Sequence, residues 1–149
     1  HVGRTARLRA ACRECGLYME RYYPVAIVTL LCGLVVFGMA LTVAKAHSKT
    51  GILAPVMTGD AYLERAVRAH SNTIEWMPIF LPSLWLFAIY WSVWWATALG
   101  AVWIIGRIIY FAGYLSGPTN RYPGFAIQAL AASALLLGAF GRIIYLCLQ

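Results

Sequence analysis

The chain has 149 residues, of which 62% are hydrophobic and only 11% are charged, and its formal net charge is +7. An ordinary soluble domain has about 25% charged residues, so this composition and the long apolar runs described below exclude a single soluble domain. The positive charge flanks apolar segments, and we interpret it as membrane-flanking rather than as a surface for nucleic acid.

The first 21 residues contain five of the ten arginines and have no good apolar face. We expect residues 1–18 to be an upstream extension or a cloning scar, disordered or weakly structured, and exclude them from the fold prediction. Cys12 and Cys15 form a CxxC pair there, which without a second ligand pair is weak evidence for redox or zinc chemistry. Residues 19–149 form the predicted membrane domain.

The first predicted span covers residues 23–46. Within it, residues 25–44 carry no charge, and a helix of that length reaches roughly 30 Å, the thickness of the hydrocarbon layer. The following segment, KAHSKTGILAPVMTGD, contains Lys, Gly and Pro residues that predict an irregular loop. Asp60 at its end is the predicted N-cap of the next helix.

The second predicted span covers residues 61–90, and Pro78 and Pro82 within it predict a bend. Residues 76–106 contain no Asp, Glu, Lys or Arg, and as one straight helix they would be roughly 46 Å long. We therefore place a turn near Trp91, among aromatic residues typical of the headgroup layer, and the third span at 93–114.

The segment LSGPTNRYPG leads to the fourth predicted span, 125–148. Small residues recur there at spacings that let membrane helices approach closely: Ala129, Ser133, Ala134 and Gly138. Cys32 and Cys147 lie inside spans, where a thiol behaves as a small hydrophobe. The sequence thus predicts an all-α membrane protein, a bundle of four transmembrane helices.

Four spans place the first and third loops on the same side of the membrane. The start of the second span, the end of the third and Arg121 in the third loop are therefore expected to meet there. Most positive charges of residues 19–149 gather on this side, so the positive-inside tendency predicts that it faces the cytoplasm.

The second and third spans each carry a polar stripe. Arg65, Arg68, Asn72 and Glu75 are spaced 3, 4 and 3 residues apart, which places them within roughly 80° of one helix face. Trp76 lies near the same arc and His70 points away from it, and on the third span Arg107, Tyr110 and Tyr114 share a face. The two stripes predict a pocket for a ligand with anionic and amine groups.

A purely structural interpretation of these residues is also open. In that interpretation, the arginines at a helix end extend their charge to the water phase, and Glu75 pairs with Arg107 inside the bundle. An ionised residue well inside a span is nevertheless costly and usually marks a site or an interior pair. The histidines have no metal-ligand spacing, and neither a phosphate loop nor a nucleophile elbow is present.

The segments ERAVRAHSNTIEWMPIFL and GRIIYFAGYLSGPTNR resemble the MAPEG family, the membrane-associated proteins of eicosanoid and glutathione metabolism. The R-A-x-x-N-x-x-E and R-x-x-Y-x-x-x-Y patterns carry the resemblance, which is best to the branch of microsomal glutathione transferases and leukotriene C synthases. The resemblance implies a homotrimer that holds glutathione between adjacent subunits and joins it to a lipophilic electrophile, with a lipid hydroperoxide as a second substrate class.

The resemblance also implies roles for individual residues. Arg68, Asn72 and Glu75 would hold the carboxylate and amino groups of glutathione, with Tyr110 beside them. Arg107 and Tyr114 match positions that line the same site, and Arg65 matches one near a carboxylate. Arg121 matches the arginine that stabilises the thiolate, and no metal is implied.

Some positions depart from the leukotriene branch. His70 and Trp76 stand where that branch more often has glutamine and tyrosine, and both are retained as secondary candidates. His47 and Ser48 replace a pair of arginines. These differences favour a general glutathione transferase over an enzyme dedicated to leukotrienes.

Two other functions are compatible with the sequence. One is a non-catalytic lipid-binding scaffold of the lipoxygenase-activating type. Scaffolds of that type lack the full set of glutathione residues, whereas this chain has all of them: Arg68, Asn72, Glu75, Tyr110 and Arg121. The other is a small transporter in which Glu75 faces a central pathway and couples protons. Activity with glutathione, or proton-coupled efflux from vesicles, distinguishes these hypotheses.

Overall fold

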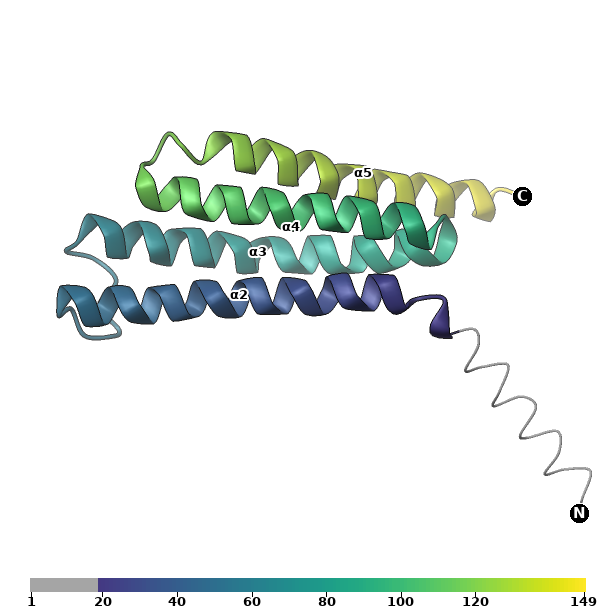
Figure 1. Ribbon diagram of the computed structural model, residues 1–149. Helices are drawn as coiled ribbons and strands as arrows, with labels where there is room; N and C mark the ends of the chain where they lie inside the picture. The colour runs from purple at the N-terminus through teal and green to yellow at the C-terminus, as the bar shows by residue number, and fades with distance from the viewer. Residues whose placement is uncertain (1–18) are drawn as a thin grey trace, which may run out of the picture.

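The computed structural model describes residues 19–149, and these form a bundle of four long antiparallel α-helices (Figure 1). The helices are α2 (Tyr23–Thr50), α3 (Ala61–Tyr90), α4 (Val93–Ser116) and α5 (Tyr122–Cys147). Both α3 and α4 contact α2 and α5, so these two form the centre of the bundle. Each of the four predicted spans is confirmed as a helix. The prediction of an irregular loop over residues 45–60 is wrong at its start, because α2 continues to Thr50, and α5 begins at Tyr122 rather than at 125. The predictions for residues 1–18, the CxxC pair included, lie outside the described residues.

The helix ends follow local sequence signals. Gly51 ends α2 with a positive φ of 72°, a conformation that glycine adopts without a side-chain clash. The Asp60 carboxylate accepts hydrogen bonds from the backbone N–H groups of Tyr62 and Leu63, which confirms the predicted N-cap. The helix α3 continues through both Pro78 and Pro82 to the turn at residues 91–92.

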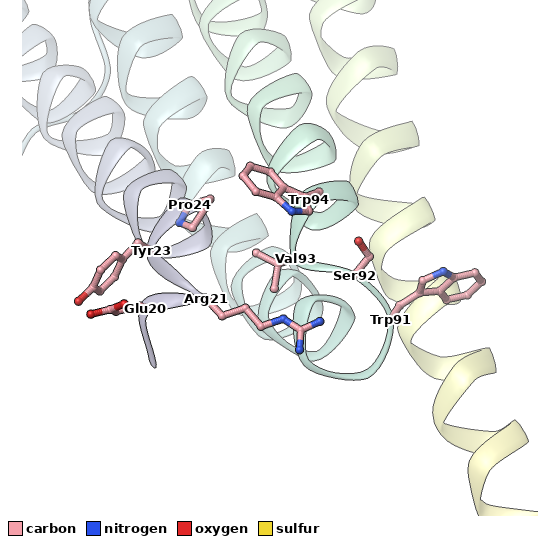
Figure 2. A pocket seen from close by; sticks show the side chains of 8 residues that line it. All are labelled: Glu20, Arg21, Tyr23, Pro24, Trp91, Ser92, Val93 and Trp94. Carbon is pink, nitrogen blue, oxygen red and sulfur yellow. The ribbon is translucent and has the colours of Figure 1, made fainter. Parts of the chain in front are cut away.

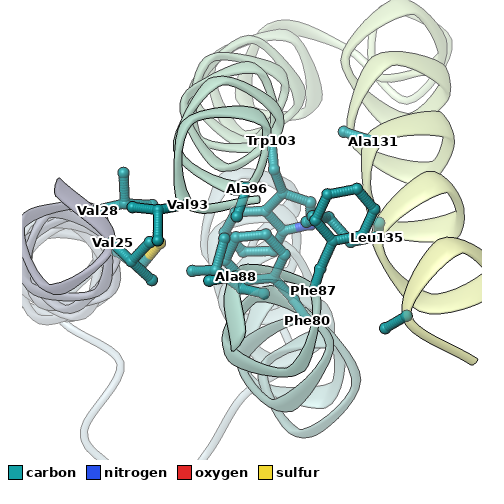
Figure 3. Packing of buried hydrophobic residues seen from close by; sticks show 14 of the residues in the cluster. Val25, Val28, Phe80, Phe87, Ala88, Val93, Ala96, Trp103, Ala131 and Leu135 are labelled. Atoms are coloured by element: carbon teal, nitrogen blue, oxygen red, sulfur yellow. The ribbon is translucent and has the colours of Figure 1, made fainter. Parts of the chain in front are cut away.

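The interior is filled mainly by aromatic and small side chains (Figure 3). Phe80 of α3 and Trp103 of α4 stack with ring centroids 4.0 Å apart. Val25 packs against this centre from the α2 side, and Ala131 and Leu135 pack against it from α5.

The outer surface of the bundle is apolar. Large hydrophobic side chains such as Leu30, Leu34 and Phe37 of α2 are exposed, which is unfavourable in water but not in lipid. All four helices are long and apolar enough to cross a membrane. Because a helix satisfies its own backbone hydrogen bonds, this arrangement suits the hydrocarbon layer.

Close packing between α4 and α5 depends on glycines that the sequence prediction did not identify. A Cβ atom on Gly124 would clash with the backbone of Tyr110 and lie 2.7 Å from the carbonyl oxygen of Gly106. In the predicted small-residue stripe of α5, Gly138 does allow a close approach, because a Cβ atom there would lie 2.6 Å from the Phe87 ring. Ser133 and Ala134 are exposed in the single chain. The residue spacing identified a stripe but not the side of the helix that contacts protein.

We expect Gly124→Ala to destabilise the bundle, because the clashing atoms belong to the α4 backbone and cannot rotate away. Overpacking of this kind costs about 1–3 kcal/mol. The measurement is the thermal midpoint of helix loss for the purified protein in detergent. Gly33→Ala is the matched control, since nothing lies within 4 Å of its added Cβ. Equal midpoints for the two variants would contradict the close α4–α5 contact.

Candidate functional site

Mostly polar side chains from α3, α4, the α4–α5 loop and the start of α5 surround a cavity of about 240 Å³. It lies toward the end of the bundle that carries both the α2–α3 loop and the α4–α5 loop (Figure 1). The residues that line the cavity are Arg68, Asn72, Tyr110, Arg121, Tyr122 and Phe125. Four of the residues proposed from sequence therefore share one cavity, although they come from three separate segments.

The two helical segments, α3 and α4, position their side chains by helical spacing. Arg68 and Asn72 are one turn apart on α3, and Tyr110 and Tyr114 are one turn apart on α4. The two tyrosine rings lie 5.7 Å apart, and the Arg121 guanidinium carbon lies 4.8 Å from the centre of the Tyr114 ring. A cation over an aromatic face is attracted by the ring electrons, which holds Arg121 beside the tyrosine pair.

Arg121 lies in the loop, outside the spans. Slight burial lowers the pKa of its guanidinium, but Tyr114 and a hydrogen bond with Tyr122 raise it, and the resulting pKa is above the ordinary value. Arg121 therefore remains a cation throughout the range in which thiols titrate.

Arg107 is fully buried beneath the cavity and does not line it. Its Nη1 donates to Asn72 Oδ1 at 3.0 Å, and its Nη2 donates to the Asn72 carbonyl oxygen at 3.5 Å. The guanidinium carbon lies between 5.1 and 5.6 Å from the ring centres of Trp76, Trp103 and Tyr110. A buried charge is tolerated only with such partners, so Asn72 and the rings fix this cation between α3 and α4.

Glu75 occupies a different environment from the one expected. The sequence predicted a buried carboxylate, and this is wrong for the single chain, because Glu75 is exposed on the outer face of α3. The interior partner of Arg107 is Asn72, not Glu75. Arg68, about two helical turns away on α3, is also exposed, so the polar stripe of α3 extends from the cavity onto the outside of the bundle.

Arg65 acts at the junction of α3 and α4. Its Nε donates to the carbonyl oxygen of Leu115 at 3.2 Å, and this carbonyl is one of those left without a helical partner at the end of α4. Arg65 and Arg68 also line a second cavity of about 550 Å³, together with Glu64 and Tyr114 among others. Arg68 is thus shared by two adjoining cavities.

The secondary candidates lie at the margin of the site. The Trp76 ring packs edge-on against Phe125, with centroids 6.1 Å apart, and so supports the cavity wall. His70 is half-buried and lines neither cavity. In residues 19–149, no group of three His, Cys, Asp or Glu side chains is placed to hold a metal ion.

Sequence reasoning missed three residues of this region. Tyr122 and Phe125 line the cavity, and the signal for Phe125 was its position one helical turn after Arg121. Gln128 is fully buried in α5, and neither its Nε2 nor its Oε1 has a hydrogen-bond partner in the described part of the chain. An amide near the start of an otherwise apolar span was the available signal.

Comparisons with known proteins find several similar chains. The model of the MAPEG family matches residues 25–141. The chain is 41% identical to human microsomal glutathione S-transferase 2 over 103 residues, 68% of this chain and 70% of that protein. It is 36% identical to guinea-pig (Cavia porcellus) leukotriene C4 synthase over 111 residues, 74% of each chain. It is 39% identical to the uncharacterized protein sll1147 of Synechocystis over 120 residues, 80% of this chain and 88% of that one.

We expect Asn72→Ala to destabilise the protein, because it leaves the Arg107 cation buried without its side-chain acceptor. Hydrogen bonds to charged groups contribute about 1.5–3 kcal/mol, and the loss should appear as a lower thermal midpoint in detergent. Asn120→Ala is the matched control, since its hydrogen bond to Ser116 is exposed. If both variants unfold at the same temperature, Asn72 does not support the buried charge.

Proposed function

Since the chain belongs to the MAPEG family, we propose that this integral, multi-pass membrane protein is a glutathione transferase. It binds glutathione, stabilises the thiolate and transfers it to lipophilic electrophiles dissolved in the bilayer. The similarity to a microsomal glutathione S-transferase and to a leukotriene C4 synthase supports this assignment. The observation that carries it is the convergence of Arg68, Asn72, Tyr110 and Arg121 on one cavity.

Glutathione carries two carboxylates, one ammonium group and one thiol, and the site has a group suited to each. The Arg68 guanidinium can donate two parallel hydrogen bonds to a carboxylate. Glu75 is the acidic partner for the ammonium, and the hydroxyls of Tyr110 and Tyr114 donate to the remaining oxygens. Asn72 and Arg107 form the base of the site through their mutual hydrogen bonds.

The proposal includes a homotrimer with glutathione between adjacent subunits. Glu75 lies near the middle of α3 and is exposed on the outer face of a single chain. A carboxylate facing lipid at that depth would be costly. A second copy packed on this face removes Glu75 from lipid and closes the open side of the cavity.

In the proposed reaction, Arg121 lowers the pKa of the bound thiol. A free thiol has a pKa of about 8.5, and a cation about 4 Å away at an effective dielectric of 20 contributes about 4 kcal/mol. The thiol proton leaves to water, and the sulfur forms a bond to the electrophilic carbon while the leaving group departs with its electron pair. With a lipid hydroperoxide, two glutathione molecules would supply the electrons that yield the alcohol, water and the glutathione disulfide.

Two features bear on orientation and on the alternative functions. Lys45, Lys49 and Arg121 lie at the end of the bundle that carries the site, which supports a cytoplasmic active site. Glu75 lies on the outside of the bundle and not along a path through it, so no observation favours a transporter.

We expect Arg121→Ala to lower the turnover of glutathione with a chromogenic aryl halide by about tenfold or more at pH 7, while glutathione affinity changes little. One unit of thiol pKa corresponds to about 1.36 kcal/mol, or tenfold in thiolate below the pKa. Because the cation favours the thiolate, its loss should move the rise in activity to higher pH. Thiolate absorbance of the glutathione complex measures the same shift directly.

Arg142→Ala is the matched control for this experiment. Its guanidinium carbon also lies over a tyrosine ring, 5.5 Å from the centre of Tyr145, but at the other end of the bundle. This variant should keep the pH profile of the unmodified protein. An unchanged profile for Arg121→Ala would refute the thiolate role, and glutathione binding without turnover in the unmodified protein would favour the lipid-binding scaffold.

A further inference from the structure

A separate cavity of about 420 Å³ lies at the end of the bundle opposite the candidate site. It lies between the start of α2 and the turn that joins α3 to α4 (Figure 2). The residues that line it are Glu20, Arg21, Tyr23, Pro24, Trp91, Ser92, Val93 and Trp94. None of them takes part in the proposed reaction.

The surrounding side chains place this cavity at the depth of lipid headgroups. Tyr23, Tyr90, Trp91, Trp94 and Trp95 are all exposed around this end of the bundle. Exposed tyrosine and tryptophan side chains are enriched where the hydrocarbon layer meets the headgroups, because their rings are apolar and their polar atoms need water. A cavity in this ring of aromatic side chains opens toward headgroups rather than toward acyl chains or bulk water.

The cavity contains one cation and one anion that do not neutralise each other. Arg21 and Glu20 are both exposed, and neither forms a hydrogen bond or ion pair in the part of the chain that the structure describes. Figure 2 shows the Arg21 side chain extending toward Ser92 and Val93, whereas Glu20 lies beside Tyr23. The two charges thus occupy different sides of the same cavity.

Backbone N–H groups of α4 add positive potential on the Arg21 side of the cavity. The helix α4 begins at this cavity, and its N-cap residue, Ser92, makes no side-chain capping hydrogen bond. The first turn of α4 contains no acidic residue, so its free N–H groups and the positive end of the helix dipole have no anionic partner there. This supports an anionic group between Arg21 and the start of α4.

We propose that this cavity binds the headgroup of a zwitterionic phospholipid. The phosphate lies between Arg21 and the first turn of α4, and the ammonium group lies at Glu20 against the Tyr23 ring. A guanidinium binds phosphate through charge-assisted hydrogen bonds. An ammonium group is attracted both to a carboxylate and to the face of an aromatic ring. Glu20 disfavours a headgroup with a net negative charge, so the site selects phosphatidylethanolamine over phosphatidylglycerol.

The test is lipid retention by the purified full chain in detergent, measured by native mass spectrometry. Phosphatidylethanolamine, phosphatidylglycerol and diacylglycerol with identical acyl chains are added at equal concentrations. We expect phosphatidylethanolamine to be retained best and diacylglycerol least. Arg21→Ala should reduce phosphatidylethanolamine retention about tenfold, as expected for a lost charge-assisted hydrogen bond.

A second variant separates headgroup recognition from general loss of charge. Glu20→Gln should abolish the preference for phosphatidylethanolamine over phosphatidylglycerol, because the repulsion of the anionic lipid is removed. Lys45→Ala is the control, since it removes an exposed cation at the other end of the bundle and should leave retention unchanged.

Four results would overturn the proposal. They are equal retention of all three lipids, an equal effect of Arg21→Ala and Lys45→Ala, full displacement of the lipid by inorganic phosphate, and a change of oligomeric state in Arg21→Ala. The third would show a site for free anions, and the fourth would show a contact between copies of the chain. None of these measurements depends on glutathione activity, so the proposal stands or fails independently of the transferase assignment.

Discussion

The geometry of the candidate site depends on one buried cation. Arg107 projects from α4 into the bundle, where Asn72 of α3 accepts its hydrogen bonds and three aromatic rings surround it. Removing a guanidinium from water is costly, so the energy of the folded state is low only when α3 and α4 are aligned to provide these partners. The same alignment brings Arg68 of α3 to the cavity that Tyr110 of α4 lines.

A second constraint fixes the remaining wall of that cavity. Gly124 lets the start of α5 pack directly on the backbone of Tyr110, and Gly113 lies against the carbonyl group of Asn120. Between these two contacts the chain holds Arg121 beside Tyr114. Backbone contact is rigid, because no side-chain rotation relieves a clash. A residue in a loop thereby acquires a defined position next to the tyrosines of α4.

The two ends of the bundle provide different environments. One end combines arginines and tyrosines, and the exposed Glu75 lies deeper, near the middle of α3. Together these groups suit a water-soluble ligand with carboxylates and an amine. The other end is ringed by exposed tryptophans and tyrosines and contains the Glu20–Arg21 cavity. Between them, the surface is apolar apart from Glu75 and matches the hydrocarbon layer. Under the proposed transferase function, this arrangement holds the polar co-substrate at one interface while the apolar substrate reaches the site from the lipid.

The sequence alone determined the four spans, the Asp60 cap, the turn near Trp91 and the end of the bundle where the polar residues gather. These follow from the length of uncharged runs, from capping chemistry and from the alternation of span direction. Only the tertiary structure decided which residues of a stripe face protein, such as Arg107, and which face outward, such as Glu75. The physical reason is that lipid is as apolar as a protein interior, so hydrophobic periodicity marks the buried side of a membrane helix only weakly. Close contacts such as Gly124 on Tyr110 likewise depend on how two distant segments pack, which no local pattern specifies.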